Sequence, residues 1–341
     1  MAQDLSAHRR TRAETASQVL SHLDAALQQG GESELRSVAT GFGILDEILG
    51  GGLRSGELLL LGGPPGVGKT IAALQWAREV ARSGSTAIFA CYEHEPTTLL
   101  VRLLGLEAGE AHGQDDYFTR DLTALLADGD ASGAGLEAVL ARHPGGAEAL
   151  RAVKQYADRL VLIRASGAHT TIEEMDALVS AHRRHDSSTV LFVDYLQKIP
   201  LQPEPSTEAE KVTRTVEALK DLALEKEIPV VLLSAVDAEG MRASRLRMYH
   251  LRGSSAIAFE SDVVLMLNSK EKAISKIHLS YDPVRARGFR EWVVVSIEKN
   301  RGGPNLIDLE FRKDFRHFRL DPEGGMVSEK LVDERSDEQE L

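Results

Sequence analysis

One short segment of the chain has the residue types and the spacing of a phosphate-binding loop. It runs from Gly63 to Thr70 and matches G-x-x-x-x-G-K-[ST] at every position, directly after the apolar run Glu57 to Leu61. Glycines let backbone N–H groups turn toward a polyphosphate, a lysine reaches its outer phosphates, and a threonine hydroxyl ligates Mg²⁺. The segment therefore predicts a nucleoside-triphosphate site with Mg²⁺ rather than a plain glycine-rich turn. We expect these residues to bind the nucleotide: Gly63, Pro64, Pro65, Gly66, Val67, Gly68, Lys69, Thr70 and Ile71.

An acid follows a second apolar run. Val190 to Val193 has the pattern of a buried strand, and Asp194 comes directly after it, so its carboxylate is expected at the carboxyl edge of a parallel sheet. There it can hold the Mg²⁺ shell together with Thr70. Acids in this position also serve as helix caps, but the phosphate loop in the same chain favours the metal role.

A third strand, Thr86 to Ala90, leads into Cys91-Tyr-Glu-His-Glu-Pro96 and brings carboxylates to the same edge of the sheet. Glu93 is the candidate base that activates the attacking water. In the alternative interpretation, Glu93 and Glu95 are acids at the N-terminus of the next helix. His94 is interpreted as a loop histidine and Cys91 as a small buried side chain.

Two further segments carry clustered cations. Lys299 and Arg301 lie at a turn between two strand-like segments and can reach a phosphate across a subunit boundary, where a cation stabilises transition-state charge. The alternative is a solvated basic turn. The second segment, Met241 to Arg252, is suited to phosphodiester contacts, or else to balancing acids on a neighbouring element. Its candidate DNA-binding residues are Arg242, Arg245, Arg247 and Arg252.

From Thr40 onward, strand-like and helix-like segments alternate, as a parallel sheet with crossover helices requires. The expected fold class is α/β: a mainly parallel, twisted sheet flanked by helices, with a C-terminal antiparallel hairpin. Expected strands are 58–61, 86–90, 160–163, 190–193, 229–233, 263–267 and 292–297. Expected helices are 70–83, 97–104, 172–185 and 209–226, and residues 107–155 give only weak helical patterns.

Composition limits the class of protein. The net charge of −12 argues against a general polyanion binder, so contact with nucleic acid must be local. The single cysteine excludes an intrachain disulfide, and the sequence shows neither a secretory signal nor a long uncharged apolar run. A cytoplasmic protein without a membrane partner is the expectation.

The expected organisation has three parts. Residues 1–36 contain a helix around Ala13 to Gln28, whose short apolar stripe packs either on its own domain or on a neighbouring subunit. Residues 37–320 form the nucleotide-binding domain. Residues 321–341 form an acidic tail, which is expected to be disordered.

Taken in chain order, these segments resemble the RecA-like ATPase domain of the DnaB replicative helicase family over about residues 13–320. The most specific matches are Asp194-Tyr-Leu-Gln197 and the turn that carries Lys299 and Arg301, beside Thr40-Gly41, Leu251-Arg-Gly-Ser254 and the phosphate loop. The resemblance implies a hexameric ring that holds ATP between its subunits and single-stranded DNA in its channel. It also implies that Glu93 is the catalytic base, that Lys299 and Arg301 enter the neighbour's site, and that the N-terminal helix grips the next subunit.

Departures from the family pattern leave a second function open. No room is expected ahead of residue 13 for the helical domain through which replicative members contact primase. Ala235 stands where the family generally has a glutamine that senses the γ-phosphate, and the Pro-Pro-Gly-Val interior of the loop is similar to KaiC and RadA proteins. The alternative is therefore a KaiC- or RadA-like regulatory or scaffolding ATPase that controls assembly with a protein partner, without unwinding.

Overall fold

The computed structural model describes residues 13–28, 37–112, 122, 124, 135–184, 187–253, 255–274 and 288–332. The chain divides into two compact units, Met1–Arg36 and Ser37–Leu341. In the first unit, helix α1 (Ala16–Gln28) has exposed apolar side chains, among them Leu20 and Leu27. The surface on which this helix packs remains a prediction.

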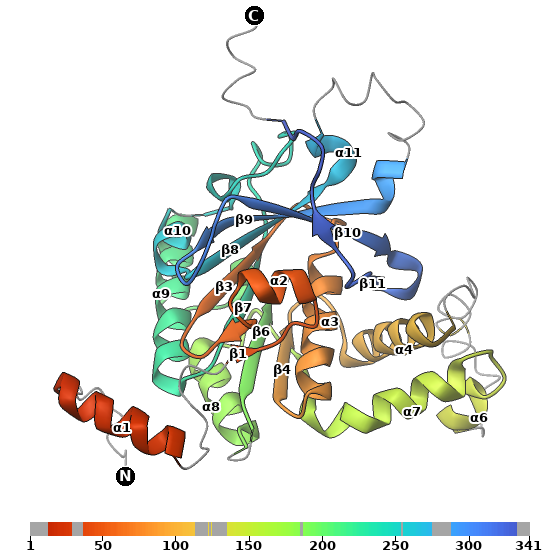
Figure 1. Ribbon diagram of the computed structural model, residues 1–341, viewed down its shortest axis with the longest axis horizontal. Helices are drawn as coiled ribbons and strands as arrows, with labels where there is room; N and C mark the ends of the chain where they lie inside the picture. Colours follow the sequence, from red (N-terminus) through yellow and green to blue (C-terminus); the bar gives the residue numbers. More distant parts are fainter. Residues whose placement is uncertain are drawn as a thin grey trace, which may run out of the picture. The chain divides into compact units, whose positions relative to one another are not determined.

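The second unit is built on one large sheet (Figure 1). Among the described residues its strands follow the order β11-β10-β9-β8-β3-β7-β6-β4-β5, with β12 beside β10. The neighbours from β8 to β5 pair in parallel, whereas β9, β10, β11 and β12 are antiparallel. In sheet order the strands are β11 (Arg319–Leu320), β10 (Ile307–Asp314), β9 (Trp292–Asn300), β8 (Val263–Ser269), β3 (Leu58–Gly62), β7 (Val230–Ser234), β6 (Thr189–Asp194), β4 (Thr86–Cys91), β5 (Leu160–Arg164), with β12 (Gly325–Met326). A separate short ladder joins β1 (Ser37–Val38) and β2 (Leu53–Arg54).

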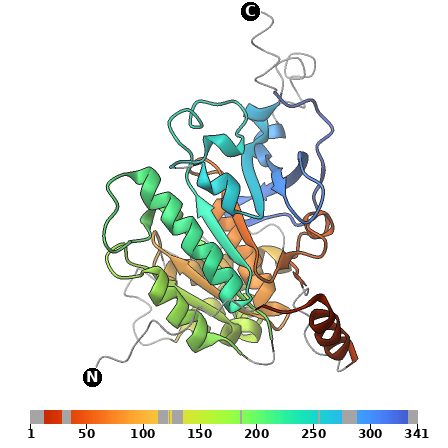
Figure 2. The ribbon, with the colours of Figure 1, turned by 90° about the vertical axis from the view of Figure 1, so that its left-hand side faces the viewer.

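Helices cover both faces of the sheet. Figure 2 shows α8 (Ile172–His182) and α9 (Glu208–Lys226) lying together over one face. On the other face lie α3 (Lys69–Arg82), α4 (Pro96–His112) and α7 (Gly146–Tyr156). The shorter helices are α2 (Gly43–Ile48), α6 (Leu136–Leu140), α10 (Ala256–Glu260) and α11 (Lys270–Ala273).

The central strands read as unbroken apolar runs because both of their faces are buried. Successive side chains of a strand point to opposite faces, so β3 divides its leucines between two cores. Leu59 and Leu61 pack with α3, whereas Leu58 and Leu60 pack with α9. This double burial fixes the strands that carry the phosphate loop and the acids at their carboxyl ends.

The expected fold class is confirmed, including the antiparallel hairpin of β9 and β10. Several expected ends differ from the observed ones. Helix α4 runs to His112 instead of residue 104, because Leu106 and Ala108 are buried in a segment whose many small residues hide the helical pattern. Helix α8 was expected to reach residue 185 but ends at His182; residues 185–186 lie outside the described part.

The acidic tail does not begin at residue 321. β12 pairs with β10, and Leu331 forms a bridge with Ile274. Glu329 forms an ion pair of 2.8 Å with Lys270, whose buried ammonium requires a carboxylate partner. The part of the tail prediction that covers residues 333–341 lies outside the described residues.

Candidate nucleotide site

The phosphate loop connects β3 to α3 in a backbone conformation that only glycine adopts without strain. Gly66 and Gly68 have φ of +76° and +111°, and a Cβ on Gly68 would lie 2.8 Å from the Phe315 ring. Gly68 is the N-cap of α3, and no side chain there accepts a hydrogen bond from the helix. The first N–H groups of α3 are therefore available to an anion at the positive end of the helix.

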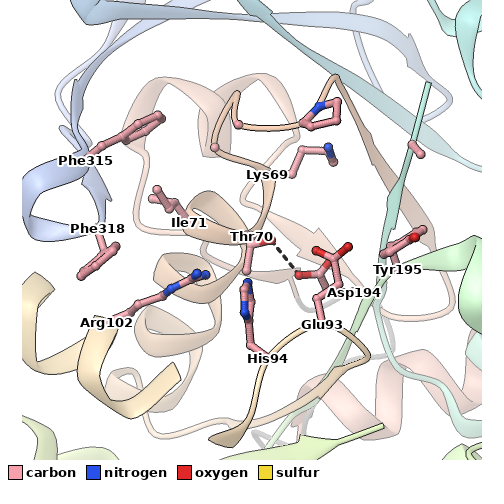
Figure 3. A pocket seen from close by; sticks show the side chains of 14 residues that line it. Lys69, Thr70, Ile71, Glu93, His94, Arg102, Asp194, Tyr195, Phe315 and Phe318 are labelled. Carbon is pink, nitrogen blue, oxygen red and sulfur yellow. Dashed lines mark hydrogen bonds between the residues drawn. The ribbon is translucent and has the colours of Figure 1, made fainter. Parts of the chain in front are cut away.

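Six of the nine expected nucleotide-binding residues line one cavity of about 510 Å³ (Figure 3). Val67 is buried beneath the loop instead of lining the cavity. Gly63 and Pro64 act through their carbonyls, which accept hydrogen bonds of 2.7 and 3.1 Å from the Lys69 ammonium. The loop residues that line the cavity are Pro65, Gly66, Gly68, Lys69, Thr70 and Ile71.

Burial in the cavity changes the pKa of Lys69. Burial lowers the pKa of Lys69, and the negative charges of Asp194 and Glu93 partly oppose that shift. The lysine is thus a desolvated ammonium held over its own loop, with acids nearby. A triphosphate would offer it a stronger anionic partner than the loop carbonyls do.

Asp194 ends β6 as expected, and its Oδ2 accepts a hydrogen bond of 2.7 Å from the Thr70 hydroxyl. A carboxylate and a hydroxyl are the hard oxygen donors that Mg²⁺ prefers, so this pair fits the expected metal. The described residues contain no group of three or more His, Cys, Asp or Glu side chains arranged to hold a metal. Mg²⁺ here would therefore take its remaining ligands from phosphate and water.

Burial raises the pKa of Asp194 to about 6; the Thr70 hydrogen bond opposes the shift and the charge of Glu93 adds to it. Between the ordinary value near 4 and pH 6, the folded chain holds a proton that the unfolded chain has released, so stability falls as the pH rises. In EDTA and without nucleotide, Asp194→Asn is therefore expected to be more stable than the natural protein at pH 7.5, by up to about 3 kcal/mol. Near pH 4 the two should be alike.

Urea unfolding at both pH values measures this difference, and the exposed Asp158→Asn serves as a control. A natural protein that is more stable than Asp194→Asn at pH 7.5 would show that the ionised carboxylate is well compensated in the fold.

Glu93 lies in the cavity beside Asp194, whereas its neighbour Glu95 does not line it (Figure 3). Glu95 forms an exposed ion pair of 2.7 Å with Arg164. Of the two acids, Glu93 thus has the position in the cavity that a base for the attacking water would need, and its catalytic role stays a prediction. His94 also lines the cavity, and burial lowers its pKa, with Arg102 adding to the shift.

Arg102, Phe315 and Phe318 line the cavity as well and were not anticipated from the sequence. Arg102 projects from α4, and its guanidinium lies 5.6 Å from the centre of the Phe318 ring. Phe315 and Phe318 come from the segment after β10, and Phe315 begins a short 3₁₀ helix (Phe315–His317).

Lys299 and Arg301 lie at α10, outside the cavity of their own chain. Lys299 donates hydrogen bonds to three carbonyls at the end of α10: Ala258 (2.7 Å), Phe259 (3.2 Å) and Ser261 (2.6 Å). Arg301 binds Asp262 Oδ1 at 3.1 Å, yet its side chain remains 52% exposed. The cations are thus held in place at the surface, and their role at a neighbour's site remains a prediction.

The arginines of the segment 241–252 have different environments. Arg245 is buried, and its Nη2 donates hydrogen bonds to both carboxylate oxygens of Asp308, at 2.9 and 2.8 Å. Arg247 binds Glu298 at 2.8 Å. Arg245 and Arg247 thus pair with acids on neighbouring strands, as the alternative to a DNA contact predicts. Arg242 is exposed, and Arg252 forms an exposed ion pair with Glu208, so these two keep the surface position that a DNA contact needs.

The fold and this site together define a RecA-like P-loop nucleotide-binding domain. A family model for the DnaB-like helicase C-terminal domain matches residues 142–320, more than half of the chain, and a KaiC model matches residues 38–119. The chain belongs to the DnaB-like helicase C-terminal domain family, so the resemblance expected from the sequence is confirmed.

Curated relatives agree with this family. The chain is 28% identical over 291 residues to the replicative DNA helicase DnaB of Treponema pallidum, covering 84% of this chain and 57% of that protein. It is 26% identical over 299 residues to DnaB of Geobacillus stearothermophilus, with the same two coverages. The chain thus spans about half the length of the curated relatives it matches.

Solved structures share the fold at low identity. One solved ATPase domain superposes with a TM-score of 0.70 at 14% identity, covering 91% of this chain and 99% of that one. A DnaB-like replicative helicase superposes with a TM-score of 0.67 at 15% identity, covering 91% and 68%.

Proposed function

We propose that this domain hydrolyses ATP with Mg²⁺ at the interfaces of a homo-oligomeric ring, a hexamer, and acts on single-stranded DNA as the motor of a DnaB-like helicase. The observation that supports hydrolysis best is the placement of Lys69, Thr70, Glu93 and Asp194 around one cavity. The names of the relatives support the helicase assignment.

In the proposed reaction, the N–H groups at the start of α3 and the Lys69 ammonium bind the phosphates. Glu93 accepts a proton from a water whose oxygen attacks the γ-phosphorus, and the bond to the bridging oxygen breaks, so ADP leaves with the electron pair. Thr70 and Asp194 would hold Mg²⁺, which, when bound, neutralises charge on the phosphates. The two aromatic rings and Arg102 would close the other end of the cavity.

Partners follow from the family rather than from the cavity. A solved DnaB-like helicase is described together with its interactions with primase, and a protein partner of this kind is part of the proposal. None of the described helices has the length and apolarity that a membrane span requires.

The proposal is tested by measuring ATP turnover with and without a single-stranded oligonucleotide at fixed salt. A helicase motor should turn over ATP faster when DNA is bound. Turnover that DNA leaves unchanged, together with no measurable DNA binding, would favour the regulatory ATPase.

The DNA contact itself is best probed at Arg242 and Arg252. Arg242→Ala with Arg252→Ala is expected to weaken oligonucleotide binding and to reduce the slope of log K against log salt, by about 0.7 for each phosphate that is no longer neutralised. Fluorescence anisotropy over a salt series measures both effects. Arg245→Ala is unsuitable because Arg245 is buried and its ion pair with Asp308 belongs to the packing of the fold.

The exposed Arg214→Ala on α9 is the matched control for this pair. An unchanged salt slope in the double variant would remove both arginines from the DNA contact.

A further inference from the structure

The Gln197 side chain joins three segments of the chain beside the nucleotide site. Its Nε2 donates to Ser234 Oγ and to the Arg252 carbonyl, each at 3.0 Å, and its Oε1 accepts from Ala235 N at 3.3 Å. A carbonyl can only accept and a backbone N–H can only donate, so these partners fix the orientation of the amide. Both donors and the acceptor of the Gln197 amide are therefore engaged.

One of these contacts lies at the nucleotide cavity, and a second lies beside it at Ser234, the last residue of β7. Ala235 lines the cavity directly after β7. Gln197 lies three residues beyond Asp194, which ends β6. The Gln197 backbone carbonyl accepts a hydrogen bond of 3.3 Å from Lys211, so α9 also holds this segment. A displacement at either strand end would therefore reach the Gln197 amide directly.

The third contact lies at the base of the segment that carries Arg242. Arg252 N donates to the Ala235 carbonyl at 3.0 Å, and Val236 bridges to Leu251. Asp237 N donates to the His250 carbonyl at 2.9 Å. These pairs close residues 237–250 into a loop whose base begins at the residue that lines the cavity.

We propose that Gln197 is a positioning residue that couples the nucleotide site to the arginine-bearing loop. Ala235 has only a methyl group and can contribute to that link only through its backbone. Gln197 supplies the side-chain hydrogen bonds that tie the ends of β6 and β7 to Arg252. The inference rests on the proposed function, because it gives a route by which hydrolysis changes the grip on DNA.

Gln197→Glu is the sharpest test because it keeps the size of the side chain. It retains an acceptor for Ala235 N, removes both N–H donors, and places a negative carboxylate against the Arg252 carbonyl. ATP turnover without DNA is expected to stay close to that of the natural protein. Stimulation by a single-stranded oligonucleotide is expected to fall toward one.

A second measurement does not depend on turnover. If nucleotide and DNA are coupled, each must change the affinity of the other by the same factor. Oligonucleotide affinity is measured with and without a non-hydrolysable ATP analogue. The two values should differ in the natural protein and converge in Gln197→Glu and in Gln197→Leu. Lys198→Gln, at an exposed neighbouring position, should leave the difference intact.

The possible outcomes distinguish a failure of this inference from a failure of the proposed function. Equal coupling in the natural protein and in both Gln197 variants overturns the inference and leaves the proposed function standing. A fall in DNA-free turnover that matches the fall in stimulated turnover also overturns it, because Gln197 would then support the fold or the catalytic site. A natural protein without any DNA effect overturns both.

Discussion

Replacing Glu93 by glutamine is expected to slow ATP hydrolysis by about 10²- to 10⁴-fold, the usual contribution of a general base. The amide keeps the size and position of the carboxylate but cannot accept the proton of the attacking water. Lys69, Thr70 and the start of α3 remain unchanged, so nucleotide affinity should stay close to that of the natural protein. Turnover under saturating ATP and binding of a labelled nucleotide together distinguish the loss of a base from the loss of the binding site.

The chain offers a matched control two residues away. Glu95→Gln makes the same change in the same segment, but Glu95 pairs with Arg164 on the surface and does not line the cavity. Its turnover should remain near the natural value, because the loss of an exposed ion pair changes the stability of the fold very little and leaves the cavity unchanged. Equal reductions in the two variants would mean that the acids act as helix N-terminal charges and that the base lies elsewhere.

The sequence was sufficient for those parts of the site that depend on one strand and the loop after it. Gly63 to Thr70 and Asp194 each follow an unbroken apolar run, and burial on both faces of the sheet makes such runs recognisable. Parallel strands bring their carboxyl ends to one edge, so the meeting of Thr70 and Asp194 could also be predicted.

Pairings between distant segments could not be predicted in this way. Phe315 lies against Gly68, and no local pattern specifies that contact. Arg245 and Arg247 read as members of a cationic loop, yet their partners Asp308 and Glu298 are 63 and 51 residues away. The arginines and their acids belong to different elements, and only the packing of β9 and β10 brings them together. Charge density along the sequence therefore overstated the cationic surface of this loop.

The proposed role of Arg301 at a neighbouring subunit's site predicts the second large effect. Arg301→Ala is expected to lower turnover by about 10³- to 10⁵-fold if its guanidinium completes the neighbour's site. The substitution should not unfold the chain, because Asp262 keeps two other partners, Lys220 at 2.6 Å and Leu58 N at 2.8 Å. Thermal unfolding checks this point, and the exposed Arg312→Ala on β10 is a control of the same type.

Mixing separates a trans effect from a local one. In a ring with head-to-tail interfaces, Arg301→Ala subunits keep Lys69, and Lys69→Ala subunits keep Arg301. Random assembly of equal amounts should therefore give about one quarter of interfaces with both groups intact. Activity should rise from two inactive proteins to a fraction of this order. Co-assembly without any recovery would show that Arg301 serves only its own chain, holding the β9–β10 turn to Asp262. Recovery would require an arginine that can leave Asp262, which is the exchange that its half-exposed position allows.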